Sequence, residues 1–185
     1  MTIRKVLICA ILLMIALCAN LHARETERER ARYFNFGPSG LLAASDGGVS
    51  PGFGMALSWN NPRLFGGHFG LGRYLNFLVP LVEDPGGVTH IGAAISIMVG
   101  PSMVVYKSGR FSVPVTVGYH FNIVSSTSID DSIRWAINMG AGAAGDAVFQ
   151  FGRRWNMFAR IMAVYNFGAG GEFLLIPALG FGYRY

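Results

Sequence analysis

Glu172-Phe-Leu-Leu-Ile-Pro-Ala-Leu-Gly-Phe-Gly-Tyr-Arg-Tyr185 is the stretch of sequence that decides the fold. Large apolar side chains fill alternate positions in it: Phe173, Leu175, Leu179, Phe181, Tyr183 and Tyr185. The positions between them include Gly180, Gly182 and Arg184. A period of two predicts a β-strand with one apolar face. In water such a strand is an aggregation hazard, whereas in a membrane it can close a β-barrel whose apolar face meets lipid.

The composition supports a membrane barrel. Hydrophobic residues make up 52% of the chain and charged residues only 14%, with 25 glycines. An average soluble domain has about a quarter of its residues charged. Beyond the N-terminal segment, no apolar run of the ~20 residues needed for a membrane helix is free of glycine and proline. Alternating strands explain a chain that is this apolar and yet lacks helical spans.

The same alternation recurs in seven earlier runs that are separated by turn signals. The eight predicted strands are 33–43, 52–60, 64–79, 89–106, 110–124, 133–151, 155–167 and 172–185. Short basic turns at one end, including Asn61-Pro62-Arg63, contrast with acidic loops at the other, such as 45–51. We therefore predict an all-β, eight-stranded antiparallel up-and-down transmembrane β-barrel. Arg73 falls on the apolar face of its run, and we expect a bulge to turn it inward.

The N-terminus predicts export. Arg4 and Lys5 precede an apolar core at 6–19, and a cleavage site follows Ala23 or Ala19. An uncleaved anchor is the alternative, although the core is short for a membrane span. We predict a signal peptide at 1–23, a charged periplasmic leader at 24–32 and an outer-membrane barrel at 33–185. Both cysteines lie in the signal peptide, which excludes a cysteine nucleophile or a cysteine-ligated zinc site in the mature chain.

Polar side chains on the inward face predict the lining of the lumen. They are His68, Tyr74, His90, Arg110, His120, Asn122, Arg134, Asn138, Asp146, Gln150, Arg160, Glu172 and Arg184. Buried charges must be paired, so we expect the four arginines to share the two carboxylates. Such a network is either structural, holding the barrel together, or the wall of a narrow polar path.

Three inward histidines raise an enzyme hypothesis. Some small outer-membrane barrels modify lipids with a histidine, a serine and a carboxylate. Here His120 is followed by Phe121 and Asn122, so the local His-x-Ser arrangement of the deacylases is missing. We therefore predict no catalytic residues, no metal site and no cofactor. The basic residues are not clustered with aromatic ones, which argues against nucleic-acid binding.

Two prolines suggest a weak seam in the wall. If Ser108 and Gly109 centre a hairpin, Pro101 and Pro114 lie at nearly matching heights on adjacent strands and weaken the same stretch of ladder. A seam of this kind would open the lumen sideways to lipid for small apolar molecules.

The ending Gly180-Phe-Gly-Tyr-Arg-Tyr185 resembles that of small bacterial outer-membrane barrels, including OmpX-like and OmpW-like proteins. The resemblance implies that Phe181, Tyr183 and Tyr185 belong to a terminal strand read by the barrel-assembly machinery, with periplasmic chaperones and outer-membrane lipid as further partners. OmpW-like members imply a narrow, rather apolar channel for small hydrophobic molecules. OmpX-like members imply a surface or adhesion role.

The sequence therefore favours a narrow channel for passive transfer of small apolar solutes. A non-transporting surface barrel for membrane integrity, adhesion or host contact is the alternative. A lipid-modifying outer-membrane enzyme is the third hypothesis.

Overall fold

The computed structural model describes residues 33–45, 48–65, 69–83, 89–127, 133–167 and 171–184. The predicted signal peptide (1–23) and leader (24–32) lie outside the described residues. In the described part of the chain, no helix is long and apolar enough to cross a membrane.

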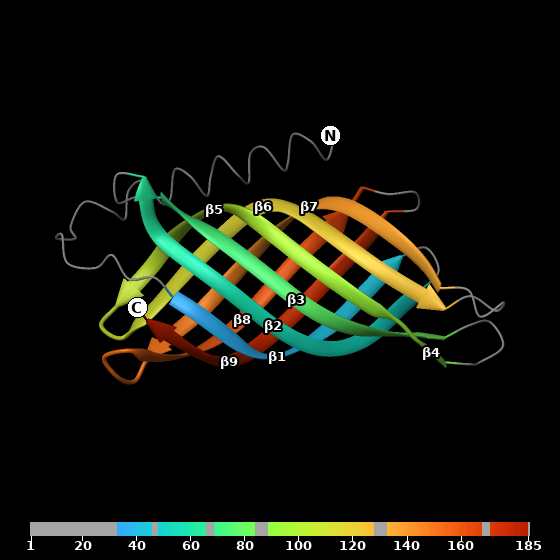
Figure 1. Cartoon of the computed structure of the whole chain (residues 1–185). Coiled ribbons are helices and arrows are strands. Elements are labelled where there is room, and N and C mark those ends of the chain that lie inside the picture. Colours follow the sequence, from blue (N-terminus) through green and yellow to red (C-terminus); the bar gives the residue numbers. More distant parts are fainter. Residues whose placement is uncertain are drawn as a thin grey trace.

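The described residues form one antiparallel sheet that closes on itself (Figure 1). Its strands are β1 (Tyr33–Ser45), β2 (Gly48–Phe65), β3 (Phe69–Glu83), β4 (Thr89–Ile91), β5 (Ala93–Ser108), β6 (Phe111–Thr127), β7 (Ile133–Gln150), β8 (Trp155–Asn166) and β9 (Glu172–Arg184). Strands β4 and β5 both pair with β3 and are separated only by Gly92, so they share one position in the wall. Pairing of β1 with both β2 and β9 closes the barrel, which confirms the predicted fold of eight antiparallel strands.

The two ends of the barrel differ in the chain termini and strand connections that lie there. We call the end where β1 begins and β9 ends the terminal end; it lies at the left in Figure 1. The connections β2–β3, β5–β6 and β7–β8 are also at this end, and we call the opposite end the loop end. The loop predicted at 45–51 is mostly strand, because β2 begins at Gly48, which pairs with Ser45. Gly48 has a φ of 120°, a backbone conformation that suits glycine at such a tight connection.

The register of the sheet tilts the strands. Following paired residues around the wall from Phe34 leads through Trp59, Arg73, Val99, Tyr119, Ala141, Tyr165 and Phe173 back to β1 at Ala44. The path re-enters β1 ten residues beyond its start, at 44 instead of 34. A shift of this kind requires the strands to be inclined to the barrel axis, as Figure 1 shows.

Apart from the bulges, side chains alternate between the inside and the outside of the wall. In β8, Trp155, Met157 and Ile161 are exposed, whereas Asn156 and Arg160 are buried. The exposed face is therefore the apolar one, as predicted. A lipocalin-like barrel would have the reverse arrangement, with aromatic residues inside and arginines outside.

Two local predictions were wrong. The turn expected at Asn61-Pro62-Arg63 lies inside β2, which continues to Phe65. The β2–β3 register shifts between Asn61 and Phe65, so a bulge accommodates Pro62 where a turn was expected. Arg73 does not turn inward, because no bulge interrupts its pairing with Trp59 and Val99, and its side chain is exposed.

Candidate functional site in the barrel interior

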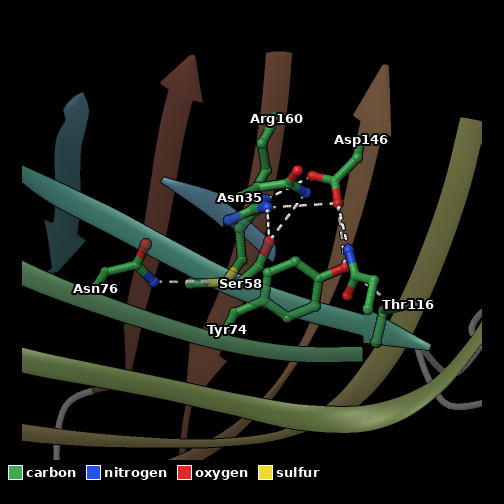
Figure 2. A network of polar contacts seen from close by, with 9 residues as sticks. Asn35, Ser58, Tyr74, Asn76, Thr116, Asp146 and Arg160 are labelled. Carbon is green, nitrogen blue, oxygen red and sulfur yellow. Dashed lines mark hydrogen bonds and ion pairs between the residues drawn. The ribbon is translucent and has the colours of Figure 1, made fainter. Parts of the chain in front are cut away.

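A buried ion pair lies inside the half of the barrel nearest the terminal end (Figure 2). Arg160 on β8 and Asp146 on β7 are direct register partners, and both side chains point inward. The Arg160 Nε donates to Asp146 Oδ1 at 2.5 Å, and Nη2 donates to Ser58 Oγ on β2. The guanidinium also lies over two rings, 4.5 Å from the centre of Tyr74 and 4.9 Å from that of Phe158. These contacts compensate a charge that would otherwise be very costly to bury.

Further hydrogen bonds extend this network across the interior. Asn60 Nδ2 donates to Asp146 Oδ2 at 3.0 Å. The Tyr74 hydroxyl is 2.8 Å from Thr116 Oγ1 and donates to Asp146 Oδ2 at 3.5 Å. The participating residues come from β2, β3, β6, β7 and β8, so the network joins opposite parts of the wall. We call these residues, with Ser58 and Arg160, the polar plug.

A second polar chain runs toward the loop end. Asn166 Nδ2 donates to Glu172 Oε2 at 2.9 Å, which leaves Asn166 Oδ1 to accept from His120 Nδ1 at 3.0 Å. His120 Nε2 then accepts from Ser96 Oγ at 2.8 Å. The protons are therefore donated in one direction, from Ser96 through His120 and Asn166 to Glu172. A serine, an imidazole and an orienting group in this order resemble an activated nucleophile, but Ser96 and His120 are both 0% exposed.

A layer of buried apolar side chains occupies another part of the interior. Its fully buried members include Met98, Met162, Leu174 and Ile176, with Leu41, Leu78 and Val164 beside them. Small inward residues make room for this layer: a Cβ added to Gly142 would lie 2.8 Å from Val164 Cγ2 and 3.2 Å from Met98 Sδ. We call this the apolar layer. Together with the polar plug it packs the barrel interior.

The predicted lumen residues lie in three kinds of place. Tyr74, His120, Asn122, Asp146 and Arg160 are buried inside, and His90, Asn138, Gln150, Glu172 and Arg184 are partly buried. The prediction that Arg110 lines the lumen was wrong. Arg110 is exposed in the turn between β5 and β6, beyond the end of the alternating pattern. His68 and the side chain of Arg134 lie outside what the structure describes.

Of the predicted sharing of two carboxylates among four arginines, the described part of the chain shows one ion pair. Asp146 binds Arg160, whereas Glu172 accepts from an amide, Asn166. The predicted lumen lining left out Asn60 and also Asn166, although Asn166 falls on the polar parity of its run; the two residues complete the two networks. Both occupy inward positions of their strands, so the parity of the sequence could have found them. Among the described residues, no three His, Cys, Asp or Glu side chains gather as a metal site.

The two seam prolines do not face each other. Pro114 pairs with Val104 across the β5–β6 ladder, and Pro101 pairs with Leu71 on the other side of β5. The hairpin turns one residue later than assumed, because Ser108 pairs with Phe111. The register shift between Val104 and Tyr106 recovers only part of this difference, so Pro114 lies opposite Val104. The pairs of the β5–β6 ladder nearest Pro101 are Val99 with Tyr119 and Ser102 with Thr116.

The residues of the predicted assembly signal lie on the last strand. Phe181 is 49% exposed on the outside, and the ring of Tyr183 is 5.4 Å from that of Trp155. Tyr185 lies outside the described residues.

Comparison with known proteins identifies the fold. No protein-family model matches the chain, and no curated protein sequence matches it. Among solved structures, Neisserial surface protein A has a TM-score of 0.65 at 13% identity, covering 85% of this chain and 100% of that one. Ail, the attachment invasion locus protein of Yersinia pestis, in complex with the heparin analogue sucrose octasulfate, has a TM-score of 0.61 at 15% identity, covering 84% and 98%.

The outer membrane protein OprG from Pseudomonas aeruginosa has a TM-score of 0.57 at 9% identity, covering 84% of this chain and 95% of that one. At such identities the likeness shows the fold alone. The chain has the fold of small eight-stranded outer-membrane barrels, in agreement with the resemblance of its last strand.

Proposed function

We propose that this protein is a closed outer-membrane barrel that acts at the membrane surface and does not conduct solutes. The observation that carries the proposal is the polar plug, in which the fully buried Arg160 and Asp146 are bonded to side chains from across the interior. Moving either charge out of this network would leave the other buried without its partner, at a cost of about 3–5 kcal/mol. The apolar layer shares Tyr74 with this plug, and its members Met162 and Val164 lie on the loop-end side of Arg160, where they add a second closure.

The membrane location rests on the outer face. Its exposed residues are large and apolar along the strands, for example Phe53, Phe77, Tyr119, Ile161 and Leu179. An exposed apolar face of this extent suits lipid and not water. We propose export through a cleaved signal peptide, delivery by periplasmic chaperones and recognition of the last strand by the barrel-assembly machinery.

Two structures of similar shape support a surface role. They are named as a surface protein and as an attachment invasion locus protein. By analogy, we propose that the loop end makes contacts outside the cell or contributes to membrane integrity.

A narrow channel for small apolar solutes is the second candidate. Both side-chain amide atoms of Asn156, and Nη1 of Arg160, are buried without a protein partner. Such groups are usually satisfied by internal water, which favours a hydrated half of the lumen. Transport would still require the apolar layer to open, or a sideways opening near Pro101 and Pro114.

The experiment that separates the candidates begins with the refolded protein in detergent. A difference in electrophoretic mobility between unboiled and boiled samples would establish a stable barrel. The same sample is then placed in a planar bilayer and in liposomes loaded with an apolar solute. We expect no conductance and no uptake above empty liposomes. Sustained conductance or uptake by the wild-type barrel would instead establish the channel.

A further inference from the structure

One charged residue stands out on the apolar outer face. Among residues whose side chains are described, Arg73 is the charged side chain that faces outward within a strand and away from the strand ends. Its neighbours along β3 on the same face are Leu71 and Leu75, and its partner on β5 is Val99. In a lipid-facing band, a lone charge is unfavourable and needs a compensating group.

Two polar-tipped side chains lie beside Arg73. Trp59 on β2 is its direct register partner, and Asn61 is the next outward position of β2 toward the terminal end. Asn61 pairs with Leu71, so Trp59, Asn61 and Arg73 occupy adjoining outward positions on two paired strands. A guanidinium, a carboxamide and an indole N–H supply only hydrogen-bond donors and one amide oxygen, a set that suits an anion.

No acidic side chain among the described residues competes for this group. Within the described part of the chain, neither Arg73 nor Asn61 has a hydrogen-bond or ion-pair partner. The described carboxylates lie elsewhere: Asp146 is inside the barrel, and Glu172 is at the loop end. The compensating anion must therefore come from outside this part of the chain.

The depth of the site matches a lipid headgroup. Arg73 lies four residues from Phe69, where β3 begins at the terminal end. Four residues span about 13 Å along a strand, and the strand tilt makes the depth along the barrel axis smaller. An arginine side chain can extend along the apolar wall and place its guanidinium at the membrane interface. Trp59 belongs at this interface as well, because tryptophan is enriched there.

We propose that Trp59, Asn61 and Arg73 form a binding site for the headgroup phosphate of an anionic phospholipid, in the leaflet at the terminal end of the barrel. The guanidinium binds two phosphate oxygens, the Asn61 amide donates to a third, and the Trp59 ring packs against the glycerol region. The inference rests on the membrane location in the proposed function, but not on whether the barrel conducts.

The test is a native mass spectrometry titration of the refolded barrel in detergent with phosphatidylglycerol, and in parallel with phosphatidylcholine. We expect Arg73→Leu to weaken phosphatidylglycerol binding about tenfold or more, since a charge-assisted bidentate contact is lost. The affinity of Arg73→Lys for phosphatidylglycerol should lie between those of Arg73→Leu and the wild type, because lysine cannot bind in the forked geometry. Asn61→Leu should weaken binding by a smaller factor.

Arg153→Leu is the matched control. Arg153 is exposed in the β7–β8 turn at the same end, so its replacement removes the same charge outside the site. Equal losses in Arg153→Leu and Arg73→Leu would overturn the site in favour of nonspecific attraction by net charge. Wild-type affinity in Arg73→Leu would overturn it outright. The unboiled gel band of each sample separates these results from failure of the membrane barrel itself, which would appear as absence of a folded band.

Discussion

Arg160 and Asp146 are direct partners in the β7–β8 ladder, and both side chains are fully buried inside the barrel. Adjacent strands thus supply opposite charges at one level, and residues from three further strands complete the network. A closed barrel interior needs such pairing, because a buried charge that loses its partner is strongly destabilising.

This pairing predicts unequal effects of single and double substitutions. Asp146→Ala should lower the free energy of unfolding by about 3–5 kcal/mol, because it leaves Arg160 buried without its carboxylate. The double variant Asp146→Leu with Arg160→Met should lose much less of the free energy of unfolding, because no unpaired charge remains in the interior. Urea titration of the lipid-embedded protein, followed by the mobility of the unboiled band, measures both. A double variant as unstable as Asp146→Ala would contradict a coupled pair.

The two closures inside the barrel should act in series. Replacing Tyr74 and Arg160 by alanine should leave the barrel closed to solutes, because the apolar layer, to which Tyr74 also contributes, keeps its other side chains, including Met98 and Met162. Adding Met98→Ala and Met162→Ala should open it, since both side chains are fully buried in that layer. Liposome swelling with small solutes measures the difference. Swelling by the Tyr74 and Arg160 double variant alone would show that the polar plug is the sole barrier.

The hydrogen-bonded series of side chains Ser96, His120, Asn166 and Glu172 should be structural and not catalytic. Ser96 is 0% exposed, so we expect no adduct when the folded barrel is treated with a fluorophosphonate probe. His120→Ala should reduce stability by about 1–3 kcal/mol, because Ser96 and Asn166 each lose a hydrogen-bond partner in the interior. Labelling that disappears in Ser96→Ala would instead revive the lipid-modifying enzyme.

Inward glycines should be intolerant of side chains where the interior is full. Gly142→Ala would place a Cβ 2.8 Å from both the Ala163 carbonyl oxygen and Val164 Cγ2, and should destabilise the barrel by about 1–3 kcal/mol. Gly145 lies on the same strand with nothing within 4 Å of an added Cβ, so Gly145→Ala is the control. Equal stability of the two variants in urea would argue against a packed interior.

The number of strands, and which face of each strand points outward, could be predicted from the local alternation of apolar and polar residues. Seven of the eight alternating runs became single strands, and the run at 89–106 became β4 and β5. The hairpin expected between 106 and 110 forms between Ser108 and Phe111, where Gly109 has a positive φ. The errors arose at irregularities: Pro62 lies in a bulge instead of a turn, and the β5–β6 hairpin turns one residue later than assumed, with a bulge between Val104 and Tyr106 that corrects this only in part. Bulges depend on how two strands fit together, so a single strand's sequence does not specify them.

By itself, the sequence determined that the protein is a barrel and which side of each strand meets the outside. Period-two alternation is a local pattern, because successive side chains of a strand point to opposite faces. It can therefore be recognised from the sequence of each strand alone. Only the tertiary structure decided which inward residues meet. Asp146 reaches Asn60, 86 positions away in the chain, and His120 reaches Asn166, 46 positions away, through the register of the closed sheet. That register is a property of all the strands together, because closure forces each pairing to agree with every other around the wall.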